Sequence, residues 1–142
     1  MESKYFTTQE LVDEEVYSLL GDNAIKLIDD RLIETIDAVR EILGVPLICN
    51  NWHWGGSRDQ CGYRSCKCNI GAQNSFHKYG MAVDLISVKM SAKEMREKLE
   101  QNKSLLPHPI RIEKWDDNGE ISWLHVDVST NTRGQKIYFF KA

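Results

Sequence analysis

The spacing of apolar residues changes once along this chain, and the change limits the folds that the chain can adopt. Between residues 24 and 43 apolar side chains recur every three or four positions, which is typical of an amphipathic helix, and Gly44 is a suitable end for it. After residue 80 they alternate or form short β-branched runs, which is typical of strands. Helices followed by strands predict an α+β fold, with N-terminal helices packed on a mostly antiparallel sheet.

Local signals place the other elements. A Thr cap followed by acidic residues predicts a helix over residues 6–20, and a capping box of Ser91 and Glu94 begins another that runs to about residue 102. Strands are predicted over residues 45–49, 81–88, 110–115, 121–128 and 136–140, the third and fourth of them as a hairpin. The chain of 142 residues contains no internal repeat, so we expect a single domain over residues 1–142.

Charge and hydropathy argue against two classes of partner. The formal net charge of −3 leaves no basic surface of the kind that neutralises phosphates, so nucleic acid is not an expected partner. The N-terminus lacks the apolar core of a signal peptide, and no apolar run approaches the roughly 20 residues that span a bilayer. We therefore expect a protein made in the cytoplasm and not inserted into a membrane, which needs another component for passage if its substrate lies outside.

Two stretches carry side chains that bind metals. The first, residues 75–85, contains His77 and Asp84, and the second, residues 123–127, contains His125. Gly80 and the β-prone run after it favour a loop histidine and a strand aspartate over a shared helix face. Three ligands with one open position are how a catalytic zinc ion is usually held. A hydrogen-bonded His–Asp pair without a metal is the alternative reading.

A long stretch rich in Gly, Asn and Trp begins at residue 50 and shows no periodicity, so we expect a loop, and long ordered loops in small domains are often functional. His53, Cys61, Cys66 and Cys68 lie in this region. A second metal site formed by these four residues is conceivable, although Cys-x4-Cys-x-Cys is not a common zinc spacing. Reduced thiols in a loop are the alternative.

Four motifs together resemble one enzyme family. They are Cys61-Gly62-Tyr63-Arg64-Ser65, Asn69-Ile70-Gly71-Ala72, Ser75-x-His77-x-x-Gly80-x-Ala82-x-Asp84, and Trp123-Leu124-His125-Val126-Asp127. In their order and approximate spacing, over about half of the chain, they resemble the zinc D-Ala-D-Ala carboxypeptidase, dipeptidase and L-Ala-D-Glu endopeptidase family, which includes many phage endolysins. The resemblance implies a fold of the Hedgehog/DD-peptidase type, with His77, Asp84 and His125 as zinc ligands.

The resemblance also implies an activity. Arg64 is implied to bind the substrate carboxylate or to polarise the scissile carbonyl, a role that suits a planar guanidinium, and Ser75 is implied to contact substrate. A solvated loop arginine is the alternative for Arg64. The implied function is zinc-dependent hydrolysis of a peptidoglycan stem-peptide bond next to a D-amino acid. A chain without a signal peptide then fits a phage or prophage endolysin that reaches the periplasm or cell wall after release by a holin.

The chain departs from the family at the catalytic base. The family has a carboxylate three residues before the last histidine, and here Ser122 holds that position, where a hydroxyl cannot act as a base near neutral pH. Glu120, two positions earlier, is the predicted replacement because alternate residues share a strand face, and an exposed turn residue beside Gly119 is the alternative reading of Glu120. Glu113 and Asp116 are further candidates. The alternative function is a catalytically silent zinc-binding domain that binds the cell wall or serves as a virion or interaction protein.

Overall fold

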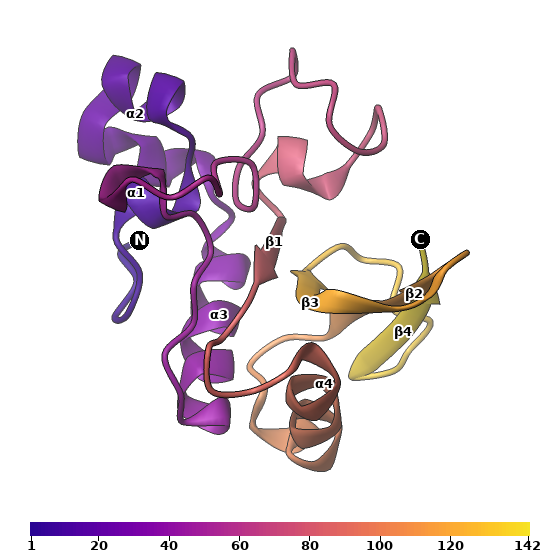
Figure 1. Cartoon of the computed structure of the whole chain (residues 1–142). Helices are drawn as coiled ribbons and strands as arrows, with labels where there is room; N and C mark the ends of the chain where they lie inside the picture. The colour runs from indigo at the N-terminus through magenta and orange to yellow at the C-terminus, as the bar shows by residue number, and fades with distance from the viewer.

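Four strands form one sheet in the computed structural model, which describes residues 1–142 (Figure 1). The strands are β1 (Ala82–Leu85), β2 (Ile110–Asp116), β3 (Gly119–Asp127) and β4 (Ile137–Lys141), in the order β1-β3-β2-β4. β3 pairs antiparallel with both β1 and β2, whereas β4 lies parallel beside β2. The predicted α+β fold in a single domain is confirmed, with a sheet that is mixed because of its last strand.

Helices and shorter 3-10 segments make up the other elements. The α-helices are α1 (Thr8–Leu11), α2 (Glu14–Leu20), α3 (Asp30–Leu43) and α4 (Ala92–Gln101), and the 3-10 segments are η1 (Gly21–Leu27), η2 (Trp52–Trp54), η3 (Phe76–Tyr79) and η4 (Lys103–Leu105). Two of the predicted boundaries are confirmed. α3 ends at Gly44 with a φ of 68°, and Ser91 caps α4 by accepting a hydrogen bond from the amide of Glu94.

Three predicted elements differ from the structure. The helix predicted over residues 6–20 is divided in two, because Val12 is extended and Asp13 caps α2 through the amide of Val16. The long helix predicted from residue 24 begins only at Asp30, because Asp29 caps it and donates its own amide to the carbonyl of Gly80. The segment predicted as a strand over residues 45–49 forms a single bridge, between Ile48 and Ile86.

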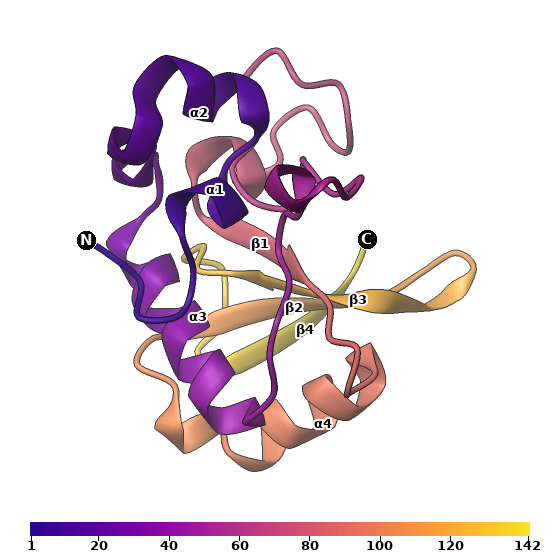
Figure 2. The ribbon, with the colours of Figure 1, turned by 60° about the vertical axis from the view of Figure 1, so that its left-hand side comes forward.

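The two faces of the sheet have different chemistry. One face carries fully buried apolar side chains that share a core with α3 and α4: Val83, Leu85, Ile110, Ile112, Leu124 and Val126. The two ribbon views show α3 running from α1 and α2 at one end of the molecule towards α4 at the other (Figures 1 and 2). The residues that alternate with these apolar positions project from the opposite face, and many of them are polar: Asp84, Arg111, Glu113, His125 and Asp127.

β3 is irregular between its two halves. His125 pairs with Glu113, and Glu120 pairs with Trp115. The chain therefore advances five residues along β3 while it advances only two along β2, so β3 bulges between these pairs. Arg96 of α4 compensates for the missing ladder bonds, since its guanidinium donates to the carbonyls of Ile121 at 3.1 Å and Trp123 at 3.3 Å. The irregular segment is therefore held against α4 rather than against β2.

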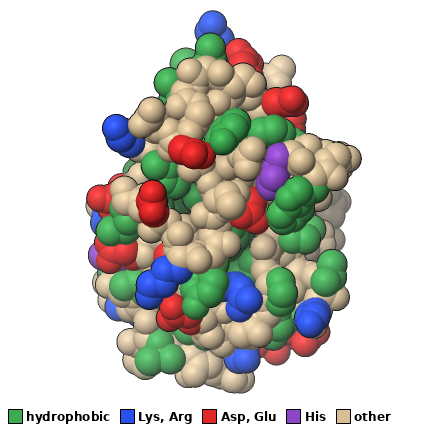
Figure 3. Space-filling model, turned by 90° about the vertical axis from the view of Figure 1, so that its left-hand side faces the viewer, with side chains coloured by type: hydrophobic (Ala, Val, Ile, Leu, Met, Phe, Trp, Pro, Cys, Tyr) green, Lys and Arg blue, Asp and Glu red, His purple; other side chains and the backbone are tan.

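The surface is mixed in character. Figure 3 shows acidic and basic side chains interspersed among hydrophobic and neutral groups on one face of the molecule. No helix is both long and apolar enough to cross a membrane.

Candidate metal centre

Three side chains from separate elements converge on one point. His77 comes from η3, Asp84 from β1 and His125 from β3, and one ligand atom from each lies within 4.8 Å of the others. Asp84 Oδ1 is 3.4 Å from His77 Nε2 and 2.9 Å from His125 Nδ1. Asp84 and His125 are direct partners in the β1–β3 ladder. The predicted ligand set is therefore brought together in a geometry that can hold a metal ion.

The ring orientation of each histidine is set by a second partner. His77 Nδ1–H donates to the carbonyl of Gly62 at 2.9 Å, and because a carbonyl can only accept, the lone pair of His77 is left on Nε2. His125 Nε2–H donates to Asp127 Oδ2 at 3.0 Å, which leaves its lone pair on Nδ1. In the neutral rings both lone pairs then face Asp84 Oδ1, and a proton or a metal ion placed between them relieves the repulsion.

The donor set fits zinc. Two imidazole nitrogens and a carboxylate oxygen match the mixed ligands of three-ligand zinc sites that leave one position open. His77 and His125 are buried and Asp84 is nearly so, which limits competition by bulk water. Each imidazole also has the outer hydrogen-bond partner that metal-binding histidines usually have.

The carboxylates around His125 favour positive charge at this point. Burial lowers the pKa of His125, but its hydrogen bonds to Asp127 and Asp84 outweigh burial and raise the pKa to about 9. Burial raises the pKa of Asp84, but hydrogen bonds from His125 and His77 outweigh it and hold that pKa well below its usual range. The carboxylates that favour a proton on His125 Nδ1 equally favour a metal cation there, so this nitrogen is available as a ligand.

This charge pattern predicts a pH dependence for the metal-free protein. The pKa of His125 is about 9 when folded and 6.5 ordinarily, so its contribution to stability is complete below pH 6.5 and is lost as the pH rises through 9. We expect the free energy of unfolding to fall by on the order of 3 kcal/mol over this range. Asp84 and Asp127 do not contribute to the change, because their pKa values lie below the ordinary 3.8.

Denaturant unfolding of chelator-treated protein at several pH values measures this effect. The fall should be much smaller in His125→Asn, where the thiols of Cys49 and Cys61, whose pKa values burial raises, still contribute near pH 9 and above. With zinc present the trend should reverse, because proton and metal compete for Nδ1. A metal-free protein equally stable at pH 6.5 and pH 9.5 would contradict the prediction.

Arg64 is buried beside the three candidate metal ligands and is not a solvated loop arginine. Its Nε donates to the carbonyl of Gln60 at 2.7 Å, and its Nη2 donates to Asp84 Oδ2 at 3.3 Å. Its Nη1 reaches the carbonyl of Ile70 at 3.4 Å. The loop from residue 60 to residue 71 thus wraps around one guanidinium, which orients the carboxylate of Asp84.

Ser75 has a local structural role as well as a place at the site. Its Oγ accepts a hydrogen bond from the amide of His77 at 3.3 Å and caps η3. Ser75 lies in the wall of the same pocket as the three metal-binding side chains.

The metal-binding side chains lie in a pocket of about 580 Å³. Arg64 and Ser75 line it, so five of the six predicted site residues meet there. Its other walls are aromatic, from Phe76, Trp123 and Phe140, with the charged groups of Arg111 and Glu113 among them. A cavity of this size admits a short segment of peptide.

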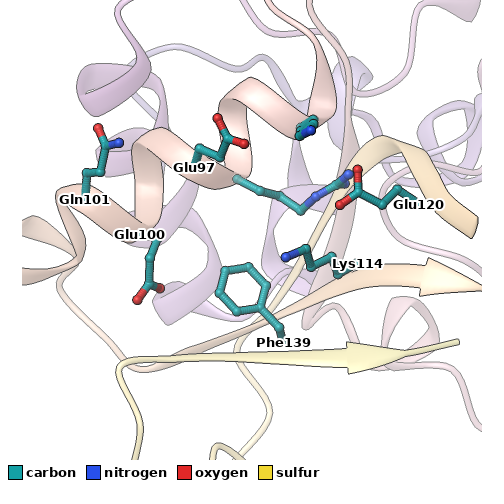
Figure 4. Close-up of a pocket in the computed structure, with 8 residues that line it drawn as sticks. Glu97, Glu100, Gln101, Lys114, Glu120 and Phe139 are labelled. Carbon is teal, nitrogen blue, oxygen red and sulfur yellow. The ribbon is translucent and has the colours of Figure 1, made fainter.

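Glu120, the sixth predicted residue, lies elsewhere. It lines a separate cavity of about 300 Å³ beside α4, where Figure 4 shows it near Lys114 and Phe139. Ser122 lines an adjoining cavity together with Glu120 and Ile121. This part of β3 faces α4, because Lys93 and Arg96 of α4 line the same cavity and Arg96 donates to the carbonyl of Ile121.

Glu113 is the carboxylate that the structure brings to the pocket. It is the direct β2 partner of His125, and cross-strand partners project from the same face. Its Oε2 lies 3.9 Å from His125 Nδ1, and burial raises the pKa of its carboxyl. The sequence named Glu113 only as a further candidate. The β2–β3 register, which places Glu113 opposite His125, distinguishes it from Glu120, but the shift in that register is not visible in the sequence.

The cysteines do not form the second site considered above. Cys49, Cys61, Cys66 and Cys68 are all free thiols, and His77, Asp84 and His125 are the one group of metal-binding side chains within ligand distance of one another. In the preceding loop, Trp52 Nε1 donates to the carbonyl of Val12 at 2.8 Å, which ties the loop to the N-terminal helices.

Comparison of the chain with protein-family models, with curated proteins and with solved structures found no match. The family resemblance of the motifs therefore stays a prediction.

Proposed function

We propose that the protein is a zinc-dependent peptidase that hydrolyses a peptidoglycan stem-peptide bond next to a D-amino acid. The observation that supports this proposal is the convergence of His77, Asp84 and His125 in a pocket that also holds a free carboxylate, that of Glu113. Ligands, a base and space for peptide are the parts that metal-assisted hydrolysis requires.

Each side chain has a task in this proposal. A bound zinc ion supplies Lewis acidity, which lowers the pKa of water and polarises a carbonyl. Glu113 takes a proton from the attacking water and passes it to the leaving amine, and its raised pKa suits both transfers. Arg64 holds Asp84 in place and presents positive charge to a substrate carboxylate or carbonyl.

The pocket wall is consistent with a peptide that carries a carboxylate. Arg64, Arg111 and Lys141 contribute positive charge, and the aromatic side chains cover apolar parts of a ligand. Action in the periplasm or cell wall after holin-type release, as for an endolysin, belongs to the same proposal.

Purified peptidoglycan tests the proposal directly. The zinc-loaded protein should release new amino groups, and mass spectrometry of the fragments identifies the bond. A chelator or His77→Ala should abolish the release, because zinc loses a ligand. His108→Ala is the matched control, since His108 pairs with Glu34 and lines neither the pocket nor the candidate metal site, so the variant should leave activity unchanged. Zinc-loaded protein that releases nothing would refute the proposal.

One observation supports a second candidate, a catalytically silent zinc-binding domain. The position of the family's base is Ser122, and the carboxylate nearest to it in the chain, Glu120, lies towards α4. Such a domain would bind zinc stoichiometrically and retain peptidoglycan fragments without cleaving them. Equilibrium binding of the fragments in the absence of released amines separates the two functions.

A further inference from the structure

Arg111 lies one hydrogen bond away from a metal-binding histidine. It faces Asp127 across the β2–β3 ladder, and its Nε donates to Asp127 Oδ1 at 3.0 Å and to Oδ2 at 3.2 Å. Its Nη2 also donates to Oδ2 at 3.2 Å. The side chain of Asp127 is fully buried, and its Oδ2 accepts the Nε2–H of His125. A continuous hydrogen-bonded chain thus runs from Arg111 through Asp127 to His125.

Two aromatic rings fix the guanidinium of Arg111 in place. Its central carbon is 4.1 Å from the ring centroid of Phe140 and 5.2 Å from that of Phe76. Phe140 packs edge-on against the His125 ring, with centroids 5.7 Å apart, and Phe76 directly precedes His77. The same guanidinium therefore touches the neighbours of two metal-binding side chains.

The chemistry of Asp127 requires this cation. A fully buried carboxylate is costly without a charged partner, and Arg111 provides the paired donors that compensate it. Kept ionised, Asp127 can only accept, so it holds the proton of His125 on Nε2. Without Arg111, the buried carboxylate would keep only His125 and the amide of Ser129 as hydrogen-bond partners, and the acceptor that orients the His125 ring would be held less firmly.

We propose that Arg111 is a positioning residue of the metal centre, which acts through Asp127 to hold His125 in the orientation and tautomer that bind zinc. The inference rests on the proposed function for the identity of the metal, but not for hydrolysis. Outer partners of this kind change metal affinity about 10- to 100-fold.

Zinc affinity tests the inference, measured by competition with a chromophoric chelator. Arg111→Met and Asp127→Ala should each weaken zinc binding about 10- to 100-fold. The double variant should be no weaker than Asp127→Ala alone, because Arg111 acts through Asp127 and the effects of coupled residues do not add. Arg111→Lys, which keeps the charge but loses the fork of donors, should fall between wild type and Arg111→Met.

A matched control and a spectroscopic measurement separate positioning from general damage. Lys114→Met removes a cation that lies 5.3 Å from the Phe139 ring on the other face of the same strands, and it should leave zinc affinity unchanged. The visible absorption of the cobalt-substituted protein reports ligand geometry and should change in Arg111→Met but not in Lys114→Met. Circular dichroism of the metal-free variants confirms folding, and the milder Arg111→Lys remains informative if Arg111→Met does not fold.

Three results would overturn the inference. The first is wild-type zinc affinity in Arg111→Met. The second is a double variant in which the losses of zinc affinity from the two single variants add in full. The third is an Arg111→Met variant in which only the KM for substrate changes. Zinc affinity is measured without substrate, so the two proposals fail separately. Weaker zinc binding in a protein that never hydrolyses peptidoglycan supports this inference and contradicts the peptidase. If the protein hydrolyses peptidoglycan but Arg111→Met binds zinc as the wild type does, the peptidase is supported and the inference about Arg111 is contradicted.

Discussion

Replacement of Glu113 by Gln is expected to lower kcat for peptidoglycan hydrolysis by about 10²- to 10⁴-fold, the usual contribution of a general base. The amide has the shape of the carboxyl but cannot take a proton from water. Glu113 does not belong to the three converging ligands, so zinc affinity should change little. Steady-state kinetics with a soluble stem-peptide fragment, together with zinc titration, measures both quantities.

Glu120→Gln is the matched control for this result. It makes the same chemical change on the adjacent strand, but in the cavity beside α4. We expect its kcat and KM to equal those of the wild type. Loss of activity in Glu120→Gln with normal activity in Glu113→Gln would reverse the assignment of the base. Normal activity in both variants would exclude both Glu113 and Glu120 as the general base.

Gly80→Ala is expected to have the largest effect on stability and to weaken zinc binding with it. Gly80 has a φ of 67°, and a Cβ there would lie 1.9 Å from the carbonyl oxygen of Leu27. The backbone after η3 must then move, and η3 carries His77. The positive φ alone costs an alanine roughly 1–2 kcal/mol. The clash adds about 1–3 kcal/mol, as in other overpacked sites.

Gly44→Ala separates these two costs. Gly44 has a φ of 68°, but a Cβ there would meet nothing within 4 Å. Its variant should lose only the conformational part and should bind zinc as the wild type does. Denaturant unfolding of both metal-free proteins, followed by zinc titration, makes the comparison. Equal destabilisation of the two variants would show that the contact with Leu27 has no energetic role.

The three candidate metal ligands were predictable because four motifs together resemble a known family. From residue type and spacing alone, His77, Asp84 and His125 left a hydrogen-bonded pair without a metal as the alternative reading. Glu113, the proposed base, was not predictable in the same way. Its identity depends on which β2 residue faces His125, and the β2–β3 register shifts between Glu113 and Trp115. A period of two assigns faces within a strand but does not reveal an irregularity in it.

The fold shows the same division between local and tertiary signals. The C-terminal end of α3 followed from Gly44 and the start of α4 from Ser91, because both residues act through neighbouring backbone groups. The start of α3 did not, because Asp29 is held by the carbonyl of Gly80, far along the chain. The parallel pairing of β4 with β2 also depends on how the chain crosses the sheet, and strand propensity does not specify direction.

The division of the sheet into an apolar face and a polar face bears on how such a protein can acquire new selectivity. The side chains that stabilise the fold, such as Leu124 and Val126, point away from the pocket, whereas Trp123, Phe140 and the loop around Arg64 border it. Substitutions at Trp123 or Phe140 can therefore reshape the pocket without opening cavities in the core. Many proteins gain function at the expense of stability, and this arrangement weakens that trade-off.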